Sequence, residues 1–304
     1  MAMTGRIVAS MVLAGTAVLA FQVQPVGDPP VDPVEPIQKL MEQVSDGTIK
    51  EDAEKKAGQF ALVSAGDTCF MRHRRVRPGV DRGLRRQLAA VRLVEGQPES
   101  AEIRSALYGK LSGLALWKTH MQEADVALRL GDLDRALLAI TKARDIADVP
   151  DVCLSDAALF SARVFIQQGA RDQAHALLVD ATRLDPVHFN AQFEHALNSM
   201  AMIGLGAADC VASVEAMVQS TIRMKAMIET SSQLFRLSER MLQHETAQRN
   251  RSFLLGFIEE QAGQPDNAAV LYAAGLQAFL EAPEAVCRSE MIAALEISLK
   301  RVTQ

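Results

Sequence analysis

The sequence has few aromatic residues for its apolar content. Aromatic side chains make up 5% of the 304 residues, with one Trp and two Tyr, whereas hydrophobic residues make up 49%. A β-sandwich core favours aromatic and β-branched side chains, while Ala, Leu and Met suit closely packed helices. We therefore expect an all-α fold.

The sequence also lacks the short motifs that carry common chemistries. It contains no HExxH, GxxxxGK[ST], GxSxG or GxGxxG segment. Its six histidines are His73, His120, His175, His188, His195 and His244. His188 and His195 are seven residues apart and could share a helix face, but neither has an evident carboxylate or cysteine partner nearby in the sequence, and His244-Glu245 carries no pattern. An isolated histidine on a helix is more often structural than catalytic. The sequence thus predicts no catalytic residue, no metal and no cofactor.

The chain has four cysteines and no CxxC pair. Because Cys69, Cys153, Cys210 and Cys287 are far apart in the sequence, a zinc site is not expected. In an oxidising compartment an even number of cysteines permits disulfides, with three ways of pairing four. The alternative, which we favour at this stage, is four small buried apolar side chains.

The first 36 residues indicate export. A single Arg6 precedes an uncharged, mostly apolar run over residues 7–21, which is typical of a signal peptide. The run is shorter than the ~20 residues that usually span a membrane. We interpret residues 1–21 as a signal peptide or an uncleaved N-terminal anchor, and the proline-rich residues 22–36 as a linker. The predicted location is periplasmic or otherwise extracytoplasmic, with membrane contact only through an uncleaved anchor.

Arginine is concentrated in one segment of a chain whose net charge is −5. The basic patch consists of Arg72, Arg74, Arg75, Arg77, Arg82, Arg85 and Arg86. One interpretation is a docking site for an anionic envelope component, and the other is a solvated segment whose arginines pair with carboxylates elsewhere. Nucleic acid is not the expected partner, because export and the scarcity of stacking aromatics both count against it.

A short pattern recurs along the chain. A glycine is followed by a short polar stretch and then by an alanine five residues after the glycine, at Gly96/Ala101, Gly131/Ala136, Gly169/Ala174 and Gly263/Ala268. Glycine can end a helix in the left-handed conformation, and Asp or Pro can begin the next helix. Alanine suits a close approach of two helices. The pattern therefore predicts pairs of consecutive helices.

With these features the chain resembles the tetratricopeptide repeat (TPR) family. The clearest unit is 155–188, with Ala162, Phe165 and Gly169 at family positions. Units beginning at 82, 117, 155, 189 and 249 are 35, 38, 34 and 60 residues apart, against a family period of about 34. The 26 extra residues, roughly 222–248, have a helical rhythm and are interpreted as one inserted helix.

The resemblance implies a right-handed α-solenoid of TPR-like hairpins over 82–304. Residues 37–81 are expected to supply N-terminal helices, at 36–44 and 48–63, followed by the arginine-rich loop. Residues 283–301 are expected to cap the last repeat with an amphipathic helix. In this register Cys153 begins a first helix and Cys210 begins a second helix of the next unit, so they lie at opposite ends of the helical layer. A 14-residue helix is about 21 Å long, which is too far for a disulfide.

The resemblance also implies a groove that binds an extended peptide or a partner helix. Its expected lining is Lys118, Met121, Asp125, Arg129, Phe160, Arg163, Gln167, Phe193 and Leu197. Met121, Asp125 and Phe160 stand where family members that clamp a C-terminal carboxylate carry Lys or Asn, so that clamp is absent. The sequence favours a non-catalytic scaffold or assembly factor of the bacterial envelope that binds a protein partner. The alternative is an envelope enzyme, or a protein that binds carbohydrate or an anionic polymer, with the repeats as an accessory.

Overall fold

The computed structural model describes residues 34–63, 113–206, 209–227 and 248–304. Residues 33–304 belong to one compact unit, and residues 1–32 are a separate segment outside the described residues. The described residues form eleven α-helices and no strand, which confirms the all-α prediction.

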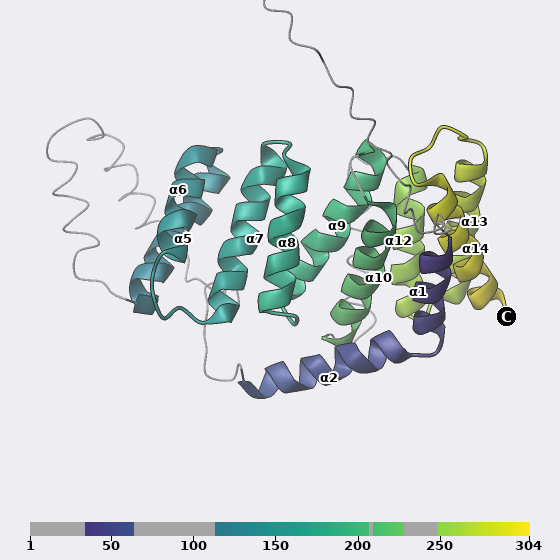
Figure 1. Ribbon diagram of the computed structural model, residues 1–304, viewed down its shortest axis with the longest axis horizontal. Coiled ribbons are helices and arrows are strands. Elements are labelled where there is room, and N and C mark those ends of the chain that lie inside the picture. Colours follow the sequence, from purple (N-terminus) through teal and green to yellow (C-terminus); the bar gives the residue numbers. More distant parts are fainter. Residues whose placement is uncertain (1–33, 64–112, 207–208, 228–247) are drawn as a thin grey trace, which may run out of the picture. The chain divides into compact units, whose positions relative to one another are not determined.

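The helices are labelled as in Figure 1. Their bounds are α1 Glu35–Ser45, α2 Thr48–Val63, α5 Gly113–Arg129, α6 Leu133–Arg144, α7 Asp151–Gln167, α8 Arg171–Leu184, α9 Phe189–Leu205, α10 Cys210–Ala226, α12 Gln248–Gln261, α13 Pro265–Leu280 and α14 Arg288–Thr303.

Consecutive helices pack in pairs. The pairs are α5 with α6, α7 with α8, α9 with α10, and α12 with α13. The first helix of each pair also contacts the first helix of the next, so α5 touches α7, α7 touches α9, and α9 touches α12. In addition, the second helix of one pair contacts the first helix of the next. Helices α7 and α9 are therefore covered on most sides by other helices.

The predicted turns have the expected backbone. Gly131 and Gly169 have φ of 74° and 78°, in the left-handed region that ends a helix. Asp132 then caps α6, because its carboxylate accepts a hydrogen bond from the Arg135 backbone N–H at 3.4 Å. The alanines five residues after the turns, Ala136 and Ala174, are fully buried. The same prediction holds for Gly263 and Ala268, while Gly96 and Ala101 lie outside the described residues.

Helices α12 and α13 approach each other at two glycines. A Cβ on Gly256 would lie 2.6 Å from Cε1 of Tyr272, and a Cβ on Gly275 would lie 2.7 Å from Cβ of Ser252. Both distances are shorter than van der Waals contact. Only a residue without a side chain fits at either point, which explains glycine in the middle of these helices despite its low helix propensity.

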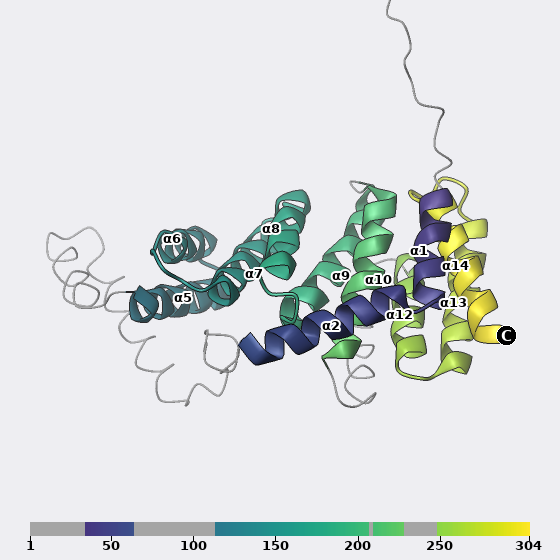
Figure 2. The same ribbon diagram turned by 60° about the horizontal axis from the view of Figure 1, so that its bottom comes forward.

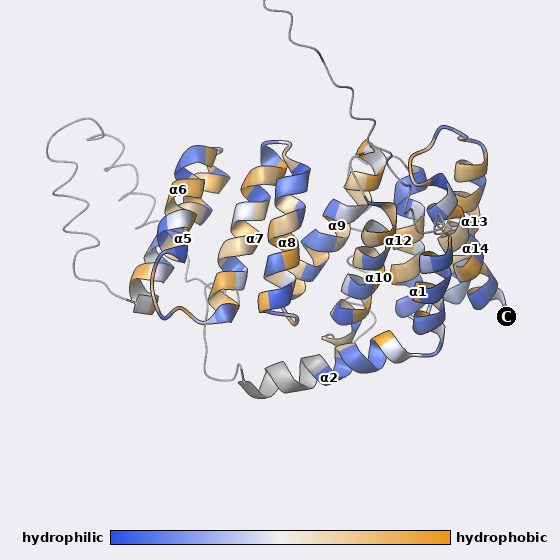
Figure 3. Cartoon of the chain, viewed as in Figure 1, coloured by the Kyte–Doolittle hydropathy of each residue, from blue (hydrophilic) through white to orange (hydrophobic). Residues whose placement is uncertain are grey.

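The described apolar residues form two clusters. The first is built from α5 to α8 and the start of α9, around Trp117 and Phe160. The second is built from the rest of α9, α10, α12 to α14, and α1. Within the second cluster the rings of Phe253 and Phe257 are stacked, with centroids 6.2 Å apart. Figure 3 shows hydrophilic as well as hydrophobic residues within α9, the helix shared by the two clusters.

The N-terminal helices lie against the C-terminal half of the unit. The predicted helices 36–44 and 48–63 are confirmed as α1 and α2, with Gly47 between them at φ 83°. Helix α1 buries Ile37, Leu40 and Met41 and packs against α14 and α10. Helix α2 packs against α10 (Figure 2).

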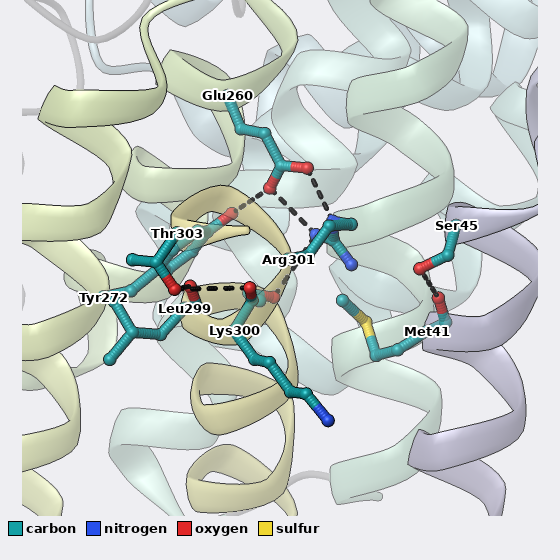
Figure 4. Close-up of polar contacts among 9 residues, drawn as sticks. Met41, Ser45, Glu260, Tyr272, Leu299, Lys300, Arg301 and Thr303 are labelled. Carbon is teal, nitrogen blue, oxygen red and sulfur yellow. Dashed lines mark hydrogen bonds and ion pairs between the residues drawn. The ribbon is translucent and has the colours of Figure 1, made fainter.

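Helix α14 packs against α13 and α1. It begins at Arg288, five residues later than predicted, after a turn over 281–287. Figure 4 shows a polar network that ties it to its neighbours: Arg301 Nε donates to Glu260 at 2.7 Å, and the Tyr272 hydroxyl donates to the same carboxylate at 2.8 Å. The network joins α12, α13 and α14. The first residues of the predicted inserted helix, 222–226, belong to α10, and residues 228–247 lie outside the described ranges.

A disulfide joins α10 to the turn before α14. Cys210 and Cys287 are bonded, with Cα atoms 5.3 Å apart and a sequence separation of 77. Cys153 is also disulfide-bonded, to a partner outside the described residues. The prediction that Cys153 and Cys210 are not bonded to each other is confirmed. The favoured interpretation of the cysteines as unpaired apolar residues is wrong for these three, because the fold brings together positions that are remote in sequence.

Candidate functional site

The apolar residues predicted to line the groove are buried. Met121, Phe160, Phe193 and Leu197 expose 0%, 0%, 4% and 7% of their surface. The reason is that α5, α7 and α9 pack against one another and against the second helices, so these side chains fill the space between helices. We correct their assignment from groove lining to core.

The charged residues of the same set remain at the surface or form ion pairs. Arg129 and Gln167 are exposed and Lys118 is partly exposed. Asp125 lies 2.6 Å from Arg129 in an ion pair within α5. Arg163 of α7 donates to Glu194 of α9 at 3.1 Å, and its guanidinium lies 5.6 Å from the centre of the Phe160 ring. The structure therefore shows one ion pair within α5 and another between α7 and α9. We call Lys118, Asp125, Arg129, Arg163 and Glu194 the row of charges on the first helices, of which only Asp125 is buried.

All seven arginines of the predicted basic patch lie outside the described residues, as does Cys69.

A buried histidine–carboxylate pair links the starts of α7 and α9. His188 Nε2 lies 2.6 Å from Asp156 Oδ1, and His188 Nδ1 accepts a hydrogen bond from the Ala191 backbone N–H at 3.0 Å. Because Nδ1 is an acceptor, the ring proton is on Nε2 and is donated to Asp156. Both ring nitrogens are thus engaged, and His188 serves as the N-cap of α9 and not as a free base.

A seam of buried polar residues runs along α9 where the two apolar clusters meet. We call it the α9 seam, and its members on that helix are Gln192, His195, Asn198 and Ser199, all buried. Arg171 of α8 donates to Asn198 at 3.2 Å. Ser220 of α10 lies 3.3 Å from His195 Nδ1. The seam is therefore built by α8, α9 and α10 together.

Two imidazoles face each other in this seam. The ring centroids of His175 and His195 are 5.1 Å apart, and the ring planes are inclined at 43°. His175 Nδ1 and His195 Nε2 are both buried and have no hydrogen-bond partner among the described residues. A buried polar atom without a partner costs about 1–3 kcal/mol. In native proteins a bound water or ion is a common partner of such an atom.

Both imidazoles are held in the neutral form. Burial lowers the pKa of His195 to about 3, with His175 and Arg223 adding to the effect. Burial also lowers the pKa of His175, against the opposing field of Asp172. Neutral imidazole has a free lone pair on one ring nitrogen, and the neutral form is therefore the one that binds metal ions.

Arg223 of α10 is a second cation near the seam, in addition to Arg171. Burial lowers the pKa of its guanidinium, while the carboxylates of Asp52 and Glu215 raise it. Its Nη2 donates to Gln219 Oε1 at 3.3 Å. Because Asp52 belongs to α2, the N-terminal helices contribute to the electrostatics of this region.

The seam was not evident from the sequence. His175, His195 and Ser220 come from three helices, and no spacing rule relates them. A signal was present in α9 itself, whose first half carries Asn190, Gln192, Glu194 and His195 although the helix is central to the fold.

Among the described residues, no helix has both the length and the apolar character to cross a membrane. Within the same residues, no group of three or more His, Cys, Asp or Glu side chains is arranged to hold a metal ion. Comparisons of the chain with protein-family models, with curated proteins and with solved structures gave no match.

Proposed function

We propose that this chain is an exported TPR-like α-solenoid that acts as a non-catalytic scaffold or assembly factor and binds a protein segment. The binding surface is the row of charged residues on the first helices. The partner is an extended segment or a helix that carries charges of both signs, because both signs are present along the row.

The repeat part of the proposal is supported by packing and turn geometry. Three glycine turns with left-handed φ precede fully buried alanines at the same interval. First helices contact first helices, and each second helix contacts the next first helix. That pattern of neighbours suits an array in which each unit buries its apolar face against the next.

Export is supported by the disulfide. Disulfides persist in oxidising compartments and are rare in the cytosol. The Cys210–Cys287 bond and the bonded Cys153 agree with the apolar run at residues 7–21, which is typical of an export signal.

The observation that carries the binding proposal is the placement of Lys118, Asp125 and Arg129. They are seven and four residues apart and share one face of α5. The Arg163–Glu194 pair continues the charges across α7 and α9. Arg129 is exposed, and Lys118 and the Arg163–Glu194 pair are partly exposed, so a partner can reach these charges. Asp125 is buried and orients Arg129 through their ion pair.

The test is capture of a partner from the native envelope with a charge-reversed variant. We expect Lys118→Glu/Arg129→Glu to lose a protein that the unmodified chain retains after stringent washing. The matched control is Lys142→Glu/Arg144→Glu, which makes the same change of charge at exposed positions of α6 and should retain it. Equal loss in both variants would indicate a non-specific charge effect. Retention in both would remove this surface as the binding site.

A further inference from the structure

We propose that His175 and His195 form a binding site for a transition-metal ion of the zinc or copper class, with water completing the coordination. The proposal rests on the geometry of the two rings and not on the proposed protein-binding function, although His195 directly follows Glu194 on α9.

The spacing of the rings suits a shared ion. Imidazole nitrogens bind Zn²⁺ at about 2.0–2.1 Å in tetrahedral geometry, which places two ligand rings roughly 5 Å apart between centroids. The observed separation is 5.1 Å. Direct hydrogen bonding between the rings is excluded, because neither His175 Nδ1 nor His195 Nε2 has a hydrogen-bond partner among the described residues.

The neighbouring groups orient the ligands. Ser220 Oγ contacts Nδ1 of His195 at 3.3 Å, which leaves Nε2 as the nitrogen that points elsewhere. An outer hydrogen bond of this kind fixes the tautomer of metal-binding histidines and raises their basicity. His195 is 8% exposed, while His175 is partly exposed, so solvent can supply further ligands from the His175 side.

Carboxylates near the seam would partly compensate the positive charge of a bound ion. The charge of Arg223 acts on His195, and Arg223 itself interacts with Asp52 and Glu215. Asp172 interacts with His175 from the preceding turn of α8. Three carboxylates and two guanidiniums, those of Arg223 and Arg171, therefore lie along the seam. This leaves an excess of one negative charge, which a divalent ion would offset.

The direct test is metal titration of the chain purified without a histidine tag and freed of metal with a chelator. We expect one Zn²⁺ per chain by calorimetry, and a Co²⁺ absorption spectrum that shows nitrogen ligation. His175→Gln and His195→Gln should each abolish the signal, and Ser220→Ala should weaken binding by about 10–100-fold. His120→Gln, on α5 outside the seam, is the control and should bind as the unmodified chain does.

The partly exposed His175 keeps the test decisive if His195→Gln fails to fold. Circular dichroism of each variant would establish folding before titration. Binding that persists in folded His175→Gln would overturn the proposal, as would the absence of binding of Zn²⁺, Co²⁺ and Cu²⁺ by the unmodified chain. The second outcome would assign the two buried nitrogens to ordered water.

Discussion

Removal of the Cys210–Cys287 bond should cost a large fraction of the stability of the second apolar cluster. The bond closes a loop with a sequence separation of 77. In the chain-entropy treatment, closing a loop of that size in the unfolded chain corresponds to about 4.5 kcal/mol at 25 °C. Native disulfides of secreted domains typically contribute 2–5 kcal/mol, so we expect a loss within that range.

The assay is urea unfolding of the unmodified chain and of Cys210→Ala/Cys287→Ala, followed by circular dichroism. The midpoint should fall, and the slope should rise, because an unfolded chain without the cross-link exposes more surface. A Cys210→Ser/Cys287→Ser variant is the companion measurement. Since both variants lose the same cross-link, similar losses would assign the effect to the bond and not to the replaced side chains.

One result would refute the reasoning. Peptide mapping of the unmodified chain is expected to recover the linked peptides that contain Cys210 and Cys287. Suppose that the bond is found, and that the free energy of unfolding of both variants lies within about 1 kcal/mol of that of the unmodified chain. The entropy of this loop in the unfolded chain then does not govern stability. The turn over 281–287 and α14 would then separate from the rest without global unfolding.

Three further predictions concern residues that join helices. Gly275→Ala should destabilise the chain by about 1–3 kcal/mol in urea unfolding, because the added methyl group overpacks the contact between α12 and α13. Adding Ser252→Gly should restore part of the loss. Stabilisation by Gly275→Ala alone would contradict the close approach of the two helices. Arg301→Met should lower the free energy of unfolding by about 3 kcal/mol, because it leaves the largely buried Glu260 carboxylate without its cation. In a double-mutant cycle, Glu260→Gln/Arg301→Met should lose less than the sum of the losses of the two single variants. Asp156→Ala should lower stability by about 1–3 kcal/mol because His188 Nε2 loses its acceptor; a variant as stable as the unmodified chain would show that the pair is dispensable.

Local features of the fold were predictable from the sequence, and contacts between distant segments were not. Gly169 and Ala174 identify a turn and a close packing position, because the backbone and volume requirements at those points are strict. The boundaries of α1 and α2 follow from Pro36 and from the Asp46–Gly47 turn, which are likewise local. In contrast, the packing of α1 against α14 depends on apolar faces that match many partners. No rule of spacing relates residues 35–45 to residues 288–303.

The same distinction explains the errors in the predicted groove. Family positions correctly placed Phe160 and Phe193 on first helices, but position on a helix does not fix exposure. Their burial follows from how closely α7 and α9 are covered by neighbouring helices, and that depends on small residues throughout the interface. Arg163 could be placed on the same helix, whereas its ion pair with Glu194 required the three-dimensional structure.

The two apolar clusters are joined at the α9 seam, and the contacts that connect distant segments lie mostly in the second cluster. The second cluster is held by the Cys210–Cys287 bond, by the Glu260–Tyr272–Arg301 network and by α1. The first cluster meets it across α9, and there buried polar residues replace continuous apolar contact. Polar contacts depend on precise geometry, while apolar contacts tolerate small shifts. A ligand that bridges His175 of α8 and His195 of α9 would therefore act at the junction of the two clusters, and its binding would stiffen the junction between them.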